Sequence, residues 1–196
     1  MTGGRRLSQA ISEGDGISIV ALVRDAQEAR AAEEQGAEGL ALLAPAVGVR
    51  DATALPVLFR VDASPEAASE AGADACLIVV EEHDDEEHLE QLHERAQALG
   101  LEIVADVHDE DSLAASLERI DPEIFLLSAR EAEDDETHLE RILDLLPDVP
   151  AGKLAIADLH VTTRDEVLAL ERAGVDAVLV GSADVAHLVG GAVPEV

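Results

Sequence analysis

The stretch that decides the fold is AGVDAVLVG, at residues 173–181. Its glycine suits the left-handed residue that ends a helix, and the apolar run after it is too short for a helix and suits a strand covered on both faces. Similar stretches are QGAEGLALL at 35–43, AGADACLIVV at 71–80 and, without a glycine, IDPEIFLLS at 120–128. The chain therefore repeats a unit in which a helix is followed by a buried strand.

Other apolar runs lie between these copies, at residues 17–23, 56–61, 102–107 and 153–159. Segments of helical period follow most of the strands, at residues 25–35, 86–99, 112–120, 138–146 and 163–173. Asp111 and Thr163 are the expected N-caps of two of these helices, and Pro65 is expected in the first turn of another.

Strict alternation of strands and helices predicts a parallel sheet with right-handed crossovers. Eight such units predict an α/β fold, a compact (β/α)8 TIM barrel with short loops after the strands. We expect residues 1–14 to be an N-terminal extension and residues 15–196 to be a single barrel domain. An open doubly wound sheet is the alternative, and it fits less well because VRDA at 23–26 contains no glycine-rich phosphate turn.

Composition excludes several classes of partner. The 196 residues include 43 Asp and Glu against 13 Lys and Arg, no Trp or Tyr, and two Phe. We expect no nucleic-acid partner, because the net charge of -30 repels phosphates and aromatic faces for base stacking are missing. We expect no membrane partner, because no apolar run approaches the roughly 20 residues of a span. The N-terminus lacks a signal peptide's apolar core and Cys76 is the single cysteine, so a cytoplasmic location is expected.

The charge also indicates the solvent in which the chain folds. Lys153 is the only lysine, and the other cations are arginines. Self-repulsion at this charge density destabilises the compact state at low ionic strength, and salt screens it. We therefore expect a halophilic protein from a salt-accumulating cytosol, whereas its oligomeric state is left open by the sequence.

Two strand ends match each other in their polar residues. One reads ADVH at 105–108 and the other ADLH at 157–160. Spacing of two places Asp106 with His108, and Asp158 with His160, on one side of each strand. Function in such barrels collects at the carboxyl ends of the strands, so these four groups are candidates for acid–base work. The alternatives are a divalent metal site, which we do not assign, and a structural role at the rim.

Scarce cations also follow strands. Arg24 closes the first strand, Arg60 the third, and Arg130 lies just past the sixth. A guanidinium presents a planar fork that suits phosphate or carboxylate, so a clamp for a small anionic metabolite is one interpretation. Pairing of each arginine with a neighbouring acid is the other. Gly181 and Ser182 after the last strand add weak evidence for an anion site, because barrels often bind phosphate there.

The chain resembles the indole-3-glycerol phosphate synthases, which are (β/α)8 lyases of tryptophan biosynthesis, over about residues 7–190. The similar segments are LSQAI at 7–11, GISIVA at 16–21, LPVL at 55–58, AGADA at 71–75, DVHDE at 106–110 and AGVDAVLVG at 173–181. The family's reaction decarboxylates and closes a ring on a phosphorylated, ring-opened sugar attached to anthranilate. The resemblance implies a lysine that acts as a general acid, a glutamate that assists it, a phosphate-binding site and no cofactor.

Most positions that the resemblance makes functional are substituted. Arg60 and Arg24 stand where the family has lysines, and Asp106 where it has the strand-five glutamate. The family's Asn-Asn-Arg becomes Ser128-Ala129-Arg130, its Ser-Glu-Ser-Gly becomes Ala157-Asp158-Leu159-His160, and its Gly-Glu-Ser becomes Gly181-Ser182-Ala183. The long loops after the first two strands are almost absent.

These substitutions keep the sign of charge and lose capacity for proton transfer. Arg60, Asp106 and Asp158 are the candidate catalytic residues, and Arg24, Arg130, Ser128, His108, His160, Gly181 and Ser182 are the candidate anion-binding residues. An arginine is a poor proton donor, because its guanidinium stays protonated in proteins. We therefore expect a barrel that has lost the indole-forming activity and binds a small phosphorylated or carboxylated metabolite. An active carboxy-lyase of this family is the alternative.

Overall fold

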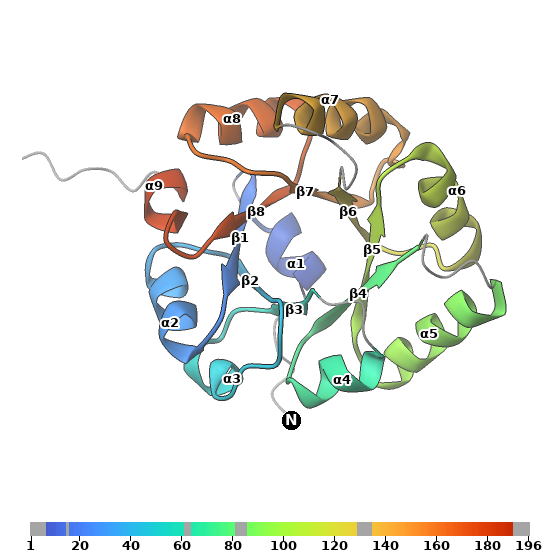
Figure 1. Ribbon diagram of the computed structural model, residues 1–196, viewed down its shortest axis with the longest axis horizontal. Helices are drawn as coiled ribbons and strands as arrows, with labels where there is room; N and C mark the ends of the chain where they lie inside the picture. Colours follow the sequence, from blue (N-terminus) through green and yellow to red (C-terminus); the bar gives the residue numbers. More distant parts are fainter. Residues whose placement is uncertain (1–6, 15, 61–63, 81–85, 129–134, 190–196) are drawn as a thin grey trace, which may run out of the picture.

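The structure, a computed structural model, describes residues 7–14, 16–60, 64–80, 86–128 and 135–189. Its strands pair in parallel and in chain order, and the last pairs with the first, which closes a barrel (Figure 1). The strands are β1 (Ser18–Val23), β2 (Gly39–Leu42), β3 (Val57–Phe59), β4 (Ala75–Val79), β5 (Glu102–Val107), β6 (Ile124–Ser128), β7 (Leu154–Asp158) and β8 (Ala177–Gly181). The predicted TIM barrel is confirmed, and the open-sheet alternative is wrong.

Helices ring the outside of the barrel (Figure 1). They are α2 (Ala26–Glu34), α3 (Val49–Ala52), α4 (Pro65–Glu70), α5 (Glu86–Ala98), α6 (Glu110–Arg119), α7 (Asp135–Leu145), α8 (Arg164–Ala173) and α9 (Val185–Val189), with α1 (Leu7–Ser12) before β1 and a short 3-10 turn, η1 (Leu146–Asp148), after α7. No helix among these described segments is long and apolar enough to cross a membrane.

Two apolar layers follow from the alternation of side chains along each strand. The outer layer lies between strands and helices and includes Phe125 and Leu127 of β6. The inner layer fills the barrel and includes Ile124 and Leu126 of the same strand. Because the inward register runs through every second residue, it continues at the carboxyl end of β6 into Ser128, and similar continuations place polar groups at the mouth of the barrel.

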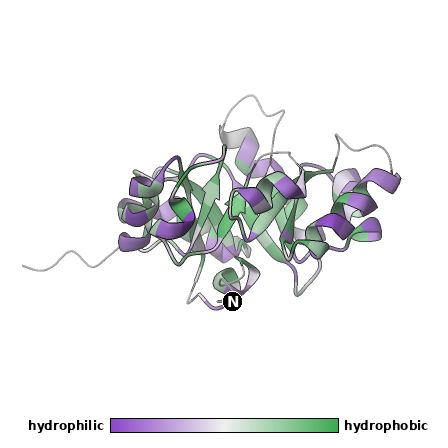
Figure 2. Cartoon of the chain, turned by 90° about the horizontal axis from the view of Figure 1, so that it is seen from below, coloured by the Kyte–Doolittle hydropathy of each residue, from purple (hydrophilic) through white to green (hydrophobic). Residues whose placement is uncertain are grey.

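Helix α1 closes the opposite end of the barrel, beneath the strands (Figure 2). Its Leu7 and Ile11 are buried in the inner layer, at 0% and 4% exposure. The Ser8 hydroxyl and backbone N–H donate to the carboxylate of Glu102 at the start of β5, the latter at 3.2 Å. The segment before β1 therefore contributes to the barrel core, while the domain boundary at residue 14 stays a prediction.

The repeated sequence unit has a structural cause. Gly36, Gly72 and Gly174 end their helices with φ of 98°, 73° and 102°, which favours glycine. After Gly72 and Gly174, the aspartate two residues further on binds the preceding strand: Asp74 accepts from the Val57 N–H at 2.8 Å. Asp176 accepts from the Ala155 N–H at the same distance. In these two copies the repeat thus ties the strand that begins after the helix to the preceding strand.

Removing these carboxylates is expected to destabilise the barrel. Asp74→Ala and Asp176→Ala each leave a strand N–H without its acceptor, at a cost of about 1–2 kcal/mol in the free energy of unfolding. Asp74→Ala costs more, because Asp74 also pairs with Arg50 at 2.7 Å. Urea unfolding at fixed KCl measures both, with Glu38→Ala at the matching position of the first repeat as the control. Equal losses in all three variants would contradict the assignment.

Helix starts were predicted with mixed success. Thr163 caps α8 in a reciprocal capping box with Glu166, and Pro65 lies in the first turn of α4, both as predicted. Asp111 is not an N-cap, because α6 begins earlier. Asp109 accepts from the Ser112 N–H at 2.7 Å and Ser112 reciprocates, so this pair sets the start of the helix.

Candidate functional site

Polar side chains meet at the mouth of the barrel, where the strands end. Val104 and Ile156 belong to the inner layer, so the side chains two residues later, Asp106 and Asp158, face inward at the rim. Ser128 is next to Asp158 in the register of β6 and β7. The three polar residues therefore form one half of the mouth, along β5, β6 and β7.

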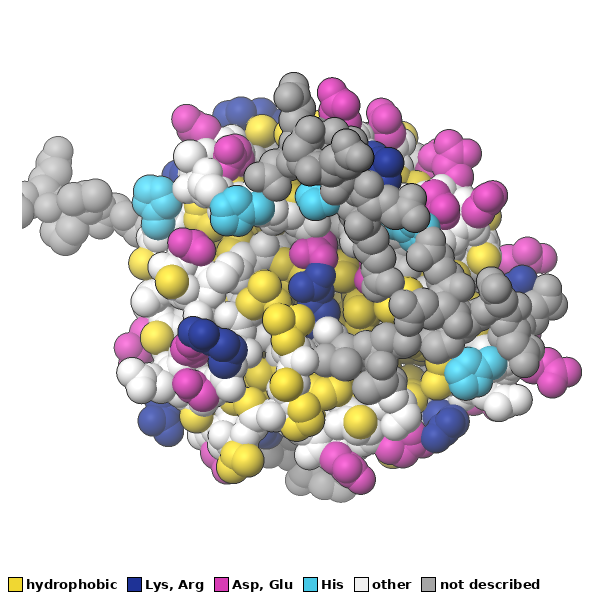
Figure 3. All heavy atoms as spheres, viewed as in Figure 1, with side chains coloured by type: hydrophobic (Ala, Val, Ile, Leu, Met, Phe, Trp, Pro, Cys, Tyr) yellow, Lys and Arg dark blue, Asp and Glu magenta, His cyan; other side chains and the backbone are white. Residues whose placement is uncertain are grey.

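Arg60 crosses the mouth from the other side. It follows β3, and its guanidinium forms an ion pair with the carboxylate of Asp158 at the end of β7. Because β3 and β7 lie four strands apart in a ring of eight, this pair spans the barrel. Both side chains are mostly buried, at 21% and 23% exposure. Figure 3 shows a basic and an acidic side chain meeting near the centre of this face, with hydrophobic side chains around them.

Asp106 is the most deeply buried polar group of the mouth, at 3% exposure. The Ser128 hydroxyl donates to its Oδ1 at 2.5 Å, and Ser128 is itself 6% exposed. A short hydrogen bond from a neighbouring strand fixes the orientation of this carboxylate. The mouth thus combines a fixed carboxylate on β5 with a guanidinium–carboxylate pair across the barrel.

Arg24 does not join that pair. Its side chain is 83% exposed and binds Glu28, one helical turn along in α2. The hydrogen bond from Arg24 holds the pKa of Glu28 below its usual range against the opposing effect of burial, and a hydrogen bond with Ser182 adds to the lowering. Of the three predicted clamp arginines, the structure therefore brings only Arg60 into the mouth, while Arg130 lies outside the described residues.

The predicted anion site after β8 is covered by carboxylates. The Asp184 Oδ2 lies 2.9 Å from where a Cβ on Gly181 would be. Ser182 contacts the carboxylate of Glu28. Two negative groups therefore lie against the backbone and hydroxyl that were expected to hold phosphate, and both would repel it.

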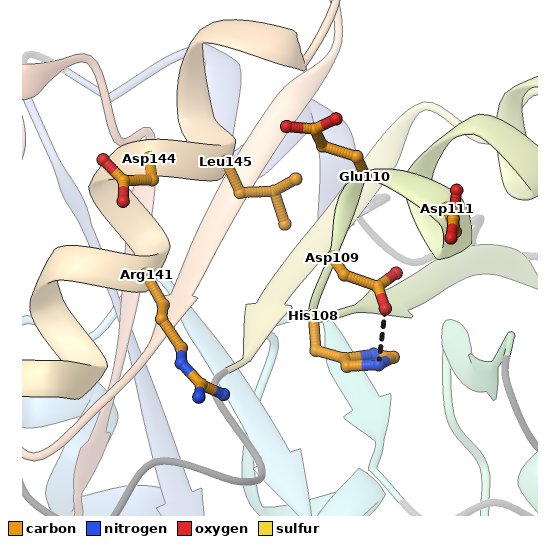
Figure 4. Close-up of a pocket in the computed structure, with 7 residues that line it drawn as sticks. All are labelled: His108, Asp109, Glu110, Asp111, Arg141, Asp144 and Leu145. Atoms are coloured by element: carbon orange, nitrogen blue, oxygen red, sulfur yellow. Dashed lines mark ion pairs between the residues drawn. The ribbon is translucent and has the colours of Figure 1, made fainter.

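His108 has an acidic neighbour and a cavity of its own. His108 Nε2 is 3.2 Å from Asp109 Oδ2, and its ring lines a cavity of about 560 Å³ between the start of α6 and α7 (Figure 4). Arg141 and Leu145 face it from α7. Burial opposes ionisation of Asp109, but hydrogen bonds from Ser112 outweigh it and lower the pKa of this carboxyl. His160 is exposed.

Metal and thiol chemistry find no support in the described segments. Within them, no group of three or more His, Cys, Asp or Glu side chains is placed to hold a metal ion. Cys76 is buried in the outer layer, and burial raises the pKa of its thiol to about 11. A thiol with so high a pKa is a poor nucleophile at neutral pH.

The family model of indole-3-glycerol phosphate synthase matches residues 48–187, which run from the start of α3 into α9. The chain belongs to the indole-3-glycerol phosphate synthase family. Relatives of that name include one from Acidithiobacillus ferrooxidans, 36% identical over 140 residues that cover 68% of this chain and 52% of the relative. Another, from Variovorax paradoxus, is 36% identical over 133 residues, covering 66% and 49%. The chain thus spans about half the length of the curated relatives it matches.

Solved structures agree on the fold. A mutant tryptophan synthase α-subunit from the hyperthermophile Pyrococcus furiosus superposes with a TM-score of 0.63 at 17% identity. The match covers 87% of this chain and 89% of that one. At this identity the likeness concerns the barrel alone.

Several groups that shape the mouth of this family member escaped the sequence analysis. Glu28 neutralises Arg24, and its spacing of four residues from Arg24 is a signal that was available. The position of Asp184 against Gly181 depends on the turn after β8 and carries no comparable signal. Leu43, an exposed leucine after β2, was counted only as part of a strand.

Proposed function

We propose that this member of the indole-3-glycerol phosphate synthase family does not catalyse the indole-forming ring closure, and that its mouth binds a small carboxylated metabolite through Arg60. The observation that carries the proposal is the ion pair across the mouth between Arg60 and Asp158. Arg60 stands where the family resemblance implies a lysine that acts as a general acid. A guanidinium cannot supply the proton that this lysine would donate.

Proton transfer is the first function that these residues fail to support. A guanidinium keeps its proton throughout the pH range in which proteins are folded, so it is a poor proton donor. General acid catalysis contributes about 10²- to 10⁴-fold to a rate, and Arg60 leaves that factor without a donor. Asp106 is fixed by Ser128 at a buried position, which preserves charge but does not replace the acid.

Phosphate binding is the second function that these residues fail to support. A phosphate dianion would meet Asp184 at Gly181 and Glu28 at Ser182. The net charge of -30 adds an unfavourable field around the molecule. A phosphorylated substrate is therefore disfavoured, and of the two anions expected from the sequence the carboxylate is the better match.

A carboxylate suits the mouth because Arg60 already holds one there. Its Nη2 binds Oδ2 of Asp158 at a partly buried position, where charge-assisted hydrogen bonds are stronger than in water. A ligand carboxylate of the same shape would replace Asp158 on the guanidinium. The proposed function is thus that of a binding protein built on the barrel of an enzyme family.

The second candidate is an active carboxy-lyase of the tryptophan pathway. The family match over residues 48–187 favours it, as does the buried Asp106 at the place of the family's strand-five glutamate. A tryptophan auxotroph of a salt-accumulating host decides between the two. We expect no growth without tryptophan when the chain is expressed as a folded protein, whereas a full-length salt-adapted family member restores growth. Growth supported by this chain would contradict the proposed loss.

Binding is tested separately by isothermal titration with acetate and with inorganic phosphate at constant ionic strength. We expect acetate to bind, phosphate to bind more weakly, and Arg60→Gln to abolish acetate binding. Arg24→Gln is the matched control, because it removes an exposed arginine at the end of β1, two strands away from Arg60. Loss of acetate binding in the Arg24 variant, with Arg60→Gln unchanged, would overturn the assignment.

A further inference from the structure

Among the described residues, two leucines, Leu22 of β1 and Leu43 after β2, lie across the mouth from the polar residues, and they carry an inference that rests on the proposed function. We infer that the ligand is an apolar monocarboxylate, with its carboxylate on Arg60 in place of Asp158 and its hydrocarbon group against Leu22 and Leu43. Asp158 then acts as a built-in competitor that sets how tightly such acids bind.

Leu43 is placed beside Arg60 by the strand register. Leu42 pairs with Phe59 across β2 and β3, so the next residues on each strand, Leu43 and Arg60, are neighbours at the rim. Gly39 and Ala41 face the interior, and the alternation continues into Leu43. Its side chain is 55% exposed, in a chain whose large apolar side chains are mostly buried.

Leu22 continues this apolar surface on β1. It packs against the inner layer and is partly buried, and its register partner on β8 is Gly181, which adds no side chain. After Leu43 the chain runs Ala44, Pro45, Ala46 and Val47 without a charge, and Val47 is 99% exposed. Ala46 packs against the outer layer, so of this segment the register places only Leu43 beside Arg60.

This arrangement discriminates between acids by their hydrocarbon part. The guanidinium selects a carboxylate. Burial of the leucine side chains favours binding only when the ligand's hydrocarbon part covers them. A second carboxylate or a phosphate on the ligand would face Asp106 or Asp158, whereas a branched alkyl group would not. The chemical class is thus a short, branched or cyclic, singly charged carboxylic acid.

Asp158 has the geometry of an internal competitor. Its carboxylate occupies the guanidinium fork that the ligand needs, and it is tethered at the end of β7. Replacing it with the neutral isostere in Asp158→Asn leaves the volume unchanged and weakens the competing contact. We expect the affinity for a monocarboxylate to rise about fivefold, which corresponds to the energy of a partly exposed ion pair.

The experiment is a titration of the full chain with isovalerate and acetate at constant KCl. We expect isovalerate to bind about tenfold more tightly than acetate, because its added carbons are partly buried. Asp158→Asn tightens both ligands. Leu43→Ser removes the preference for isovalerate and leaves acetate unchanged, whereas Leu99→Ser, an exposed leucine after α5, changes neither.

The outcomes separate this inference from the proposed function. Two results would show that the leucines do not contact the ligand: equal binding of acetate and isovalerate by the parent chain, or an unchanged preference in Leu43→Ser. Either result would leave Arg60 as a carboxylate site. Weaker binding in Asp158→Asn would show that Asp158 supports the ligand and would overturn the competitor role. No binding of either acid by the parent chain or by Asp158→Asn would overturn the proposed binding function itself.

Discussion

The temperature of thermal unfolding is expected to rise by about 10 °C between about 0.1 M and 1 M KCl, in a range where screening shortens the Debye length from about 10 Å to 3 Å. The cause is the excess of 43 acidic over 13 basic residues, whose mutual repulsion is relieved in the folded state by salt. We propose on this ground that the protein is adapted to a salt-rich cytosol. Calorimetry over a KCl series measures the effect.

Two controls distinguish screening from other effects of salt. Choline chloride at equal ionic strength should give a similar rise, because screening depends on charge and not on the identity of the cation. Sucrose at concentrations that stabilise proteins by exclusion should not reproduce the dependence on ionic strength. An unfolding temperature that is independent of KCl would refute the adaptation.

Leu7→Ala is expected to lower the free energy of unfolding by about 3 kcal/mol, within the range seen for buried leucines. Leu7 is fully buried in the inner layer, and Gly39 approaches it so closely that an added Cβ would lie 3.2 Å from its Cδ1. Truncation would therefore open a cavity at the floor of the barrel. Urea unfolding followed by circular dichroism, at constant KCl, gives the value.

Gln9→Ala is the matched control for Leu7→Ala. Gln9 lies in the same helix but is exposed, and its side-chain amide donates to Glu13 Oε1 at 2.7 Å. We expect it to change stability by less than about 0.5 kcal/mol. An equal, small effect of both substitutions would show that α1 is an appended segment, as the boundary predicted at residue 14 would have it.

The barrel was predictable because its cause is local and repeated. A glycine that ends a helix, an aspartate that ties two strands and a short buried run recur along the sequence, as in residues 71–80 and 173–181. Such patterns indicate that helices and strands alternate, and only a few sheet topologies are compatible with strict alternation. That α1 closes one end of the barrel was not predicted, because its cause is not local. The apolar residues Leu7 and Ile11 of this six-residue helix do not indicate which surface they pack against.

The mouth was predictable only in part. The inner-layer residues Val104 and Ile156 place Asp106 and Asp158 inward two residues later, as spacing along the strands suggests, whereas Ser128 was a candidate only through the family resemblance. Which charges pair across the barrel depends on side-chain reach between strands distant in sequence, and Arg60 finds Asp158 while Arg24 turns to Glu28. The contact of His108 with Asp109, and the cavity that His108 lines beside α6 and α7, likewise depend on the loop after β5 and not on the spacing along the strand.

The central claim is that an arginine spanning the mouth has replaced the proton donor of the family. It is tested most directly by incubating the purified chain, folded in KCl, with the family's phosphorylated anthranilate substrate and following the indole product by fluorescence. We predict no product above the buffer control. Product formation that is abolished in Arg60→Gln and in Asp106→Asn would contradict the account, because it would make the mouth an active site.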